Sequence, residues 1–406
     1  MNKLNAFMIV FLAFSAILFI SILPVKASGE LWVNRAPMTD AEFNFGAASA
    51  NGAIYTIGHN FTYAFDPFTD VWVYKTQMPS HRQSFAIALC QNKIYVIGGW
   101  NSTDPHTGIA ITMGTNEMYD PATDTWTNRA SLPTPTANME ASVIDDKIYV
   151  ISGMADISKP TLSSSNWVYD PSSNSWSSAA SIPTSVFNYA SAVVDNKIYV
   201  EGGGLSGSPY YCNLNQIYDP KTNTWTLGEP LPVMVHNGAA GATTGVLATA
   251  KLYVIGGTND GIHGVDTVQI YDSQTGNWTL GAQMPTARLG LAVAVSNDTL
   301  YALGGISSAG PQNNKGAIYA VNEQYIPLDY QGTIPSPYIP TPSPRSTSTP
   351  TPTPTTSPNF GPTSSPTPSP SIPEFSSLAI PLLFTVIVAA GLLVYRKKHK
   401  TKATQP

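Results

Sequence analysis

The sequence has few cysteines and few charged side chains for a chain of 406 residues. With two cysteines, disulfides cannot supply most of its stability, so a hydrophobic core must do so. Charged residues make up 11% of the sequence, the formal net charge is -5, and no Lys/Arg cluster interrupts the body of the chain. We therefore expect no nucleic-acid partner. The glycine pairs follow apolar runs and do not open helices, which argues against a phosphate-binding loop.

An internal repeat fills most of the chain. Its first motif is an apolar run around a tyrosine that usually ends in Gly-Gly, as in Lys93 to Gly99. The tyrosines of the six copies are Tyr55, Tyr95, Tyr149, Tyr199, Tyr253 and Tyr301. A second motif, mostly Tyr-Asp-Pro, is followed in five copies by a tryptophan: Trp72, Trp126, Trp176, Trp225 and Trp278. A period of roughly 40 to 54 residues is typical of propeller blades rather than of helical solenoids.

These motifs resemble the kelch repeat. The resemblance covers about residues 31 to 327 and implies an all-β fold, a six-bladed kelch-type β-propeller with four strands in each blade. The β-branched and aromatic runs suit buried strands, and Asp-Pro is typical of turns. We expect the repeated Trp and Tyr side chains to pack between neighbouring blades rather than to bind a ligand.

The sixth copy of the repeat lacks its tryptophan. Residues 322–327 parallel residues 116–121, but no Trp follows them. A strand-like segment containing Trp32 lies instead near the N-terminus. The sequence therefore predicts that an N-terminal strand completes the last blade and closes the ring, which removes the open sheet edges.

The two ends of the chain differ in composition from the repeats. Residues 1–27 resemble a signal peptide, with Lys3, a long apolar run and Ala27 before the expected cleavage site; an uncleaved N-terminal anchor is the alternative. The propeller is expected over residues 28–330. Residues 331–372 are rich in Pro, Ser and Thr and are expected to form an extended, O-glycosylated stalk. Residues 373–400 contain Pro-Glu-Phe, an apolar run long enough to form a transmembrane helix, and a basic tail.

The C-terminal arrangement resembles the sorting signals of archaeal surface proteins that archaeosortases process. The resemblance implies that the helix is removed and the mature end is attached to a lipid; a retained single-span anchor is the alternative. Both predict an extracellular propeller held at the cell membrane. Four sequons would be glycosylation acceptors in such a protein, at Asn60, Asn101, Asn277 and Asn297.

One face of the predicted propeller is irregular, whereas the other is made of short, similar turns. The irregular loops span residues 100–116, 154–166, 204–215, 258–267 and 306–316. Variable loops on a rigid scaffold are where recognition usually occurs. The five histidines of the propeller fall on this face: His59, His81, His106, His236 and His263.

The histidines raise the possibility of a metal site, but no pair has close ligand spacing. The run Tyr210-Tyr211-Cys212 resembles the Tyr–Cys crosslink of galactose oxidase, but the sequence offers no matching set of copper ligands. We expect no metal and no other cofactor. Cys212 is expected on the irregular face and Cys90 near the other, so a disulfide between them is not expected.

Two sets of equivalent residues precede the innermost strands and are expected to form rings near the mouth of the central channel. The first set is Asn44, Ser84, Asn138, Asn188, Asn237 and Gly290. The second set is Glu42, Arg82, Thr136, Val186, Val235 and Arg288. The amides could bind a sugar or a peptide backbone; alternatively, they satisfy backbone groups at the strand ends or ordered water.

Two functional hypotheses follow. The first is a cell-surface recognition module that binds a glycan or a protein through the irregular face. Its candidate binding residues are Glu42, Asn44, Arg82, Ser84, Trp100, Asn138, Asn188, His236, Asn237 and Arg288. The alternative is a carbohydrate-active enzyme, by analogy with galactose oxidase or sialic acid epimerases, in which Glu42, Arg82, His236 and Arg288 would bind carboxylates and transfer protons. A purely structural role in the cell coat remains open.

Overall fold

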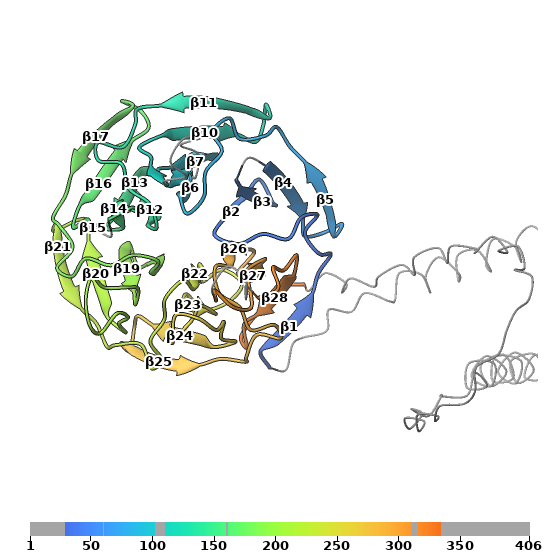
Figure 1. Cartoon of the computed structure of the whole chain (residues 1–406). Coiled ribbons are helices and arrows are strands. Elements are labelled where there is room, and N and C mark those ends of the chain that lie inside the picture. Colours follow the sequence, from blue (N-terminus) through green and yellow to red (C-terminus); the bar gives the residue numbers. More distant parts are fainter. Residues whose placement is uncertain (1–28, 60, 102–109, 160, 311–315, 334–406) are drawn as a thin grey trace, which may run out of the picture. The chain divides into compact units, whose positions relative to one another are not determined.

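The computed structural model describes residues 29–59, 61–101, 110–159, 161–310 and 316–333. These residues form six four-stranded antiparallel sheets arranged as blades around a central channel (Figure 1). The six-bladed propeller predicted from the repeats is confirmed. The predicted signal peptide, the C-terminal segment and nearly all of the predicted stalk lie outside the described residues. Within the described ranges, no helix has the length and apolar character needed to cross a membrane.

The blades follow one another along the chain, and each starts at the channel and ends at the rim. The first three are β2 (Gly46–Ala50), β3 (Ala53–Gly58), β4 (Phe61–Asp66) and β5 (Val71–Tyr74); β6 (Ala86–Cys90), β7 (Lys93–Ile97), β10 (Asn116–Asp120) and β11 (Thr125–Arg129); and β12 (Glu140–Ile144), β13 (Lys147–Ile151), β16 (Asn166–Asp170) and β17 (Ser175–Ser178). The fourth and fifth are β18 (Ala190–Val194), β19 (Lys197–Glu201), β20 (Asn215–Asp219) and β21 (Thr224–Leu227); and β22 (Ala239–Ala242), β23 (Leu252–Ile255), β24 (Val268–Asp272) and β25 (Asn277–Leu280).

The sixth blade is assembled from both ends of the propeller. It contains β26 (Ala292–Ser296), β27 (Thr299–Leu303), β28 (Asn322–Ile326) and, at the rim, β1 (Leu31–Asn34). Trp32 lies opposite Tyr325, as Trp126 lies opposite Tyr119 in the second blade. The predicted closure by an N-terminal strand is therefore confirmed.

The tryptophan of each blade bonds to the preceding blade. The indole nitrogen of Trp32 donates to the carbonyl of Ala282 at 2.9 Å. The other five donate in the same way, from Trp72 to Ala36, Trp126 to Thr76, Trp176 to Ala130, Trp225 to Ala180 and Trp278 to Glu229. Because the ring is partly buried against its neighbours while its N–H is satisfied, each tryptophan stabilises one seam between blades.

Tyrosines fill the same seams. Tyr55 packs on Tyr119 of the next blade with ring centroids 5.8 Å apart. Four further pairs have centroids 5.5 to 5.9 Å apart: Tyr95–Tyr169, Tyr149–Tyr218, Tyr199–Tyr271 and Tyr253–Tyr325. The predicted packing of the repeated aromatic side chains between blades is confirmed.

The Gly-Gly pairs also join neighbouring blades. The second glycine of the pair donates its N–H to a backbone carbonyl that precedes the next innermost strand, as Gly99 does to Thr136 at 2.9 Å. Both glycines of this pair have positive φ, 66° for Gly98 and 91° for Gly99. A Cβ on Gly98 would lie 2.4 Å from the Thr136 carbonyl oxygen, so a side chain there would push the blades apart.

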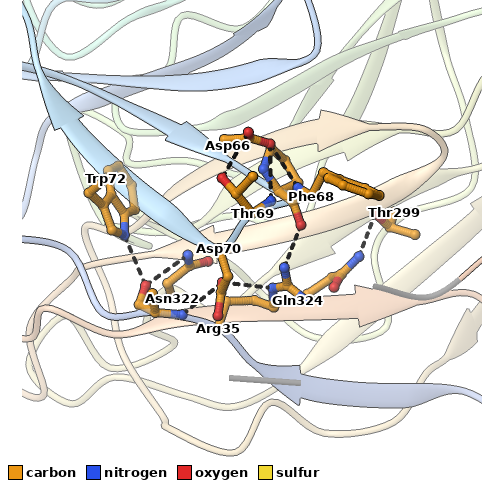
Figure 2. A network of polar contacts seen from close by, with 11 residues as sticks. Arg35, Asp66, Phe68, Thr69, Asp70, Trp72, Thr299, Asn322 and Gln324 are labelled. Carbon is orange, nitrogen blue, oxygen red and sulfur yellow. Dashed lines mark hydrogen bonds and ion pairs between the residues drawn. The ribbon is translucent and has the colours of Figure 1, made fainter. Parts of the chain in front are cut away.

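The closing segment is fixed by a polar network (Figure 2). The Arg35 guanidinium is fully buried and pairs with Asp70 at 3.2 Å. The same Asp70 oxygen accepts the N–H of Ala36 at 3.0 Å, and Asn322 donates to the Ala36 carbonyl at 3.1 Å. Residues 35–36 are thus tied to the first blade and to β28 at once.

Removal of the Trp32 side chain tests the closure. We expect Trp32→Ala to destabilise the propeller by about 3 kcal/mol, because a packed indole and its hydrogen bond are lost from the seam. Thermal unfolding followed by circular dichroism measures this loss. The control is Leu31→Ala, which changes the neighbouring side chain, 44% exposed, in the same strand. Equal melting temperatures for the two variants would contradict closure through Trp32.

Glu201 breaks the apolar pattern of the repeats. Glu201 is the last residue of β19, the second strand of its blade, and the second strands of the other blades carry Ile or Leu at this position. The side chain is fully buried. Neither carboxyl oxygen has a hydrogen-bond partner in the described part of the chain. Burial raises the pKa of this carboxyl well above its usual value of 4.5. Since the folded protein keeps the proton while the unfolded chain releases it, stability is full below about pH 4.5 and falls as the pH rises.

We expect Glu201→Ile to raise the melting temperature at neutral pH. The stability difference from the native protein should grow by up to about 1.4 kcal/mol per pH unit above pH 4.5, because an ionised carboxylate is disfavoured in the seam. Urea unfolding at several pH values measures it. Glu229→Gln, at an exposed glutamate, is the control. A difference independent of pH would show that Glu201 is not held protonated.

Candidate functional site

A closed circle of backbone hydrogen bonds surrounds one end of the channel. The residues that form it precede the six innermost strands: Asn44, Ser84, Asn138, Asn188, Asn237 and Gly290. Each N–H donates to the carbonyl of the preceding member at 2.7 to 3.0 Å, and Asn44 closes the circle onto Gly290 at 2.8 Å. We call this set the amide ring. The residues occupy one equivalent position in every blade, as the alignment of the repeats predicts.

The backbone of the amide ring explains its composition. Every member has a left-handed backbone, with φ between 49° and 63°. Asn and Gly tolerate this conformation better than other residues, and Ser84 is the single exception to that preference. The ring therefore has a structural role at its backbone. Binding of a ligand by its side chains stays a prediction.

The side chains of the amide ring line a cavity of about 50 Å³ at the channel mouth. The Asn188 amide nitrogen lies 3.4 Å from Nε2 of His236, and the Asn138 amide nitrogen lies 3.5 Å from the sulfur of Met154. Asn44 extends over Gly290, where a Cβ would lie 2.7 Å from the Asn44 amide oxygen. The amides thus connect the channel mouth to the loops on the same face.

The second predicted ring does not line the channel mouth. Arg82 and Arg288 are fully buried, and Thr136, Val186 and Val235 are at most 2% exposed. The left-handed turn of the amide ring directs these residues into the seams between blades, where a glycine N–H donates to the carbonyls of Thr136, Val186, Val235 and Arg288. The side chains of the second set therefore do not form the expected ring at the mouth.

The ion pairs and hydrogen bonds of the two arginines are formed with groups inside the protein. Arg82 pairs with Glu117 and donates to the carbonyls of Gly98 and Val96 at 3.0 and 2.9 Å. Arg288 pairs with Glu323 at 2.5 Å and donates to the Ala302 carbonyl at 3.0 Å. Buried guanidinium groups held in this way stabilise a seam, so we propose no ligand contact for either arginine.

Glu42 contacts His59, which packs on His81 between the first and second blades. Its carboxylate lies 2.7 Å from Nδ1 of His59, and the rings of His59 and His81 have centroids 5.2 Å apart. The hydrogen bond to Glu42 raises the pKa of His59 against the opposing effect of burial. Protonation of His59 therefore strengthens a contact that already exists in the fold.

His236 belongs to an aromatic cluster between the fourth and fifth blades. Its ring centroid lies 4.8 Å from that of Tyr211 and 5.2 Å from that of Phe187. Burial lowers the pKa of His236 to about 4, so the imidazole is neutral at physiological pH. Its Nδ1 is buried without a hydrogen-bond partner in the ranges that the structure describes.

The other metal-ligand candidates are dispersed. His263 pairs with Asp260 at 2.7 Å on an exposed loop, and His106 lies outside the described residues. Among the described residues, no three His, Cys, Asp or Glu side chains are grouped so that they could hold a metal ion. Cys90 and Cys212 are both free and buried, which agrees with the expectation of no disulfide between them.

The irregular loops are braced against the body of each blade. Isolated β-bridges join the start of each loop to the segment entering the innermost strand, at Gln83–Trp100, Ala137–Met154, Phe187–Gly204, His236–Thr258 and Leu289–Ile306. Trp100 also begins a small hairpin of β8 (Trp100–Asn101) and β9 (Ile111–Thr112), and a second hairpin pairs β14 (Met154–Asp156) with β15 (Thr161–Leu162). The Ile157 N–H donates to Thr112 at 3.1 Å, which links these two loops. The described parts of these loops are therefore held in place against the blades.

Exposed apolar side chains project from this face. They lie on the irregular loops and on the segments beside them, at Ile111, Tyr210, Met234, Ile262 and Ile318, and they are 42% to 67% exposed. A groove of about 400 Å³ runs between the third and fourth blades, lined by Leu162, Pro183 and the loop from Leu205 to Pro209. Apart from Tyr210, which was considered only for a copper site, sequence reasoning missed these residues. In the sequence, such residues can be recognised as apolar side chains within loops that are rich in Gly, Ser and Asn.

The sequence is similar to known propeller families. Residues 118–326 match the family described as Attractin/LZTR1 beta-propeller, and residues 81–133 match the kelch motif. The first match covers just over half of the chain.

Three curated proteins illustrate the similarity. The chain is 28% identical over 139 residues to Kelch repeat and BTB domain-containing protein 1 of camelpox virus, covering 32% of this chain and 24% of that protein. It is 27% identical over 130 residues to mouse Kelch-like protein 35, covering 30% and 22%. It is 31% identical over 108 residues to rat Kelch-like protein 24, covering 26% and 17%. The chain thus spans about a quarter or less of the length of these relatives.

One solved structure shows the same fold. The structure of YjhT superimposes with a TM-score of 0.60 at 17% sequence identity, over 70% of this chain and 95% of that chain. At this identity the likeness concerns the fold alone.

Proposed function

The chain belongs to the attractin/LZTR1 β-propeller family, and on that basis we propose that it is a recognition module that binds a protein partner through its irregular loop face. Kelch propellers are typically protein-interaction modules. The observation that carries the proposal is the set of exposed apolar side chains on loops that are braced before any partner binds. Preformed loops lose little conformational entropy on binding, and apolar side chains beside a groove are typical anchors of an interface.

The enzyme alternative lacks support at the residues first considered for it. Arg82 and Arg288 are enclosed by their glutamates, and His236 is neutral and packed between two aromatic rings. The Glu42 carboxylate is hydrogen-bonded to His59. None of the four presents a free acid, base or cation to a substrate at the channel mouth.

We further propose that the module is displayed outside the cell. The support is the order of segments in the sequence: a signal-like N-terminus, a Pro/Ser/Thr-rich stretch over residues 331–372, and an apolar run with a basic tail over residues 373–400. In this arrangement the partner is a protein of the cell surface, the envelope or the medium. Attachment is through a C-terminal helix or through a lipid that replaces it.

Substitution on the loop face tests the binding proposal. We expect the triple variant Tyr210→Ser, Met234→Ser, Ile262→Ser to weaken binding to whole cells at least tenfold, because each change removes an exposed apolar anchor. The matched control is Leu227→Ser, Leu280→Ser, which removes exposed apolar side chains from outer strands. Flow cytometry with the labelled protein measures binding.

Pretreatment of the cells identifies the class of partner. Protease should abolish binding if the partner is a protein, whereas periodate, which destroys sugars, should not. Loss of binding after periodate but not after protease would show that the partner is a glycan and not a protein. Equal binding by the triple variant and the native protein would contradict the proposed face.

The location is tested by protease accessibility on intact producing cells. We expect an affinity tag placed after Gly332 to be removed from the full chain by external protease, since the propeller and its exit segment are outside. A variant lacking residues 373–406 should appear in the medium instead of the cell fraction, because it has lost its anchor. Retention of this variant by the cells, or protection of the tag, would contradict surface display.

A further inference from the structure

One carboxyl group lies in the central channel, just inside the amide ring. Glu140 is the first residue of β12, two positions after Asn138. The other five blades carry Gly46, Ala86, Ala190, Ala239 and Ala292 at this position. The fold is thus built with a minimal side chain there, and a carboxyl group is not needed to form a blade.

The Glu140 carboxyl has space on its channel side. It borders two adjoining cavities of about 50 and 180 Å³. A further cavity of about 340 Å³ continues along the axis between the innermost strands. Apart from Glu140 and Ser191, the walls next to the ring are small or apolar side chains: Ala47, Ile87, Ala141, Ala240 and Val293. A polar group in such a space has few alternatives to a ligand or water as its partner.

Among the residues that the structure describes, none neutralises the Glu140 carboxyl. The main chain of Glu140 is bonded to the hydroxyl of Tyr189, but its carboxyl oxygens have neither a hydrogen bond nor an ion pair in the described ranges. Glu140 and Tyr189 are the sole ionisable side chains among the residues that line these three cavities. Glu140 keeps some surface exposed to the channel, but its position deep in the propeller raises the pKa of its carboxyl to about 8. Burial raises the pKa of Tyr189 still further, so both carry their protons at neutral pH.

We propose that the channel behind the amide ring binds one monovalent cation on the Glu140 carboxylate, in exchange for the proton of that carboxyl. One carboxylate balances one positive charge, and the absence of a second acid on these cavity walls disfavours a divalent ion. Amide oxygens of the ring and the Ser191 hydroxyl lie on the same walls and are suitable neutral ligands. The 50 Å³ cavity has room for a bare cation or an ammonium group, whereas the methyl groups of a quaternary ammonium keep its charge away from the carboxylate and leave it no N–H to donate.

The proton makes the exchange measurable. Because the site must lose a proton to gain the cation, affinity should rise about tenfold per pH unit up to about pH 7 and should level off above pH 8. Near pH 7 the full chain, held in a mild nonionic detergent, should release close to one proton per molecule at saturation. A pH indicator in weakly buffered solution detects the release.

The experiment compares cations at constant chloride. Potassium, sodium and methylammonium chloride are titrated against choline chloride, which supplies the same ionic strength with a cation whose methyl groups keep its charge away from a carboxylate. We expect proton release and a rise in melting temperature of a few degrees with at least one of the first three, and neither effect with choline. Release by potassium or sodium identifies a metal ion, and release by methylammonium alone identifies an organic ammonium group.

Two substitutions separate the site from the fold. Glu140→Gln keeps the shape, and Glu140→Ala restores the side chain of the neighbouring blades; both should fold and release no proton. Glu229→Gln, at an exposed glutamate, should behave as the native protein does. Equal responses of native protein and Glu140→Gln, a response to choline, no proton release with any of the cations, or a response to calcium or magnesium alone would each overturn the proposal.

Discussion

Six backbone hydrogen bonds join the blades into a circle at the amide ring, and each one fixes the point where an innermost strand begins. The left-handed conformation at these positions turns the chain from the seam between blades into the channel wall. It thereby decides which neighbours face outward and which are buried. The residues before the turn meet the Gly-Gly pairs, and the residues after it line the channel. The loops, the seams and the cavity beside Glu140 all take their positions from this circle.

One equivalent position in the seams is occupied by glutamate in some blades and by glutamine in others, and each side chain is bonded to the segment that enters the innermost strand. In the second and sixth blades, Glu117 and Glu323 are paired with buried arginines. In the fourth and fifth blades the equivalent position is glutamine: Gln216 exchanges two hydrogen bonds with the backbone of Thr184, and Gln269 does so with Val233. A neutral amide that satisfies the backbone replaces an ion pair whose desolvation is costly. This equivalence explains why the arginines belong to the architecture and not to a ligand site.

The fold could be predicted from the sequence because its signals are local and repeated. The tyrosine recurs in all six copies of the repeat, the tryptophan in five and the Gly-Gly pair in four, and Trp32 supplies the tryptophan that the last copy lacks. The direction of Arg82 and Arg288 was not predictable in this way, since it depends on the backbone turn at the next residues. The exposed apolar side chains were missed because irregular loops do not repeat. Glu140 and Glu201 could have been found, since an acid aligned with five small or apolar residues is visible in the sequence.

The last blade has a consequence for the order of events during biosynthesis. Its rim strand, β1, is the first part of the propeller to be made, and its partner β28 is the last, with Trp32 opposite Tyr325. The first strand must therefore wait, unpaired, until nearly the whole propeller has been synthesised. Contacts so distant in sequence are slow to form, because a large loop must close before they stabilise the chain. Until then β1 stays without its partner strand, and an unpaired strand edge is a site at which chains aggregate.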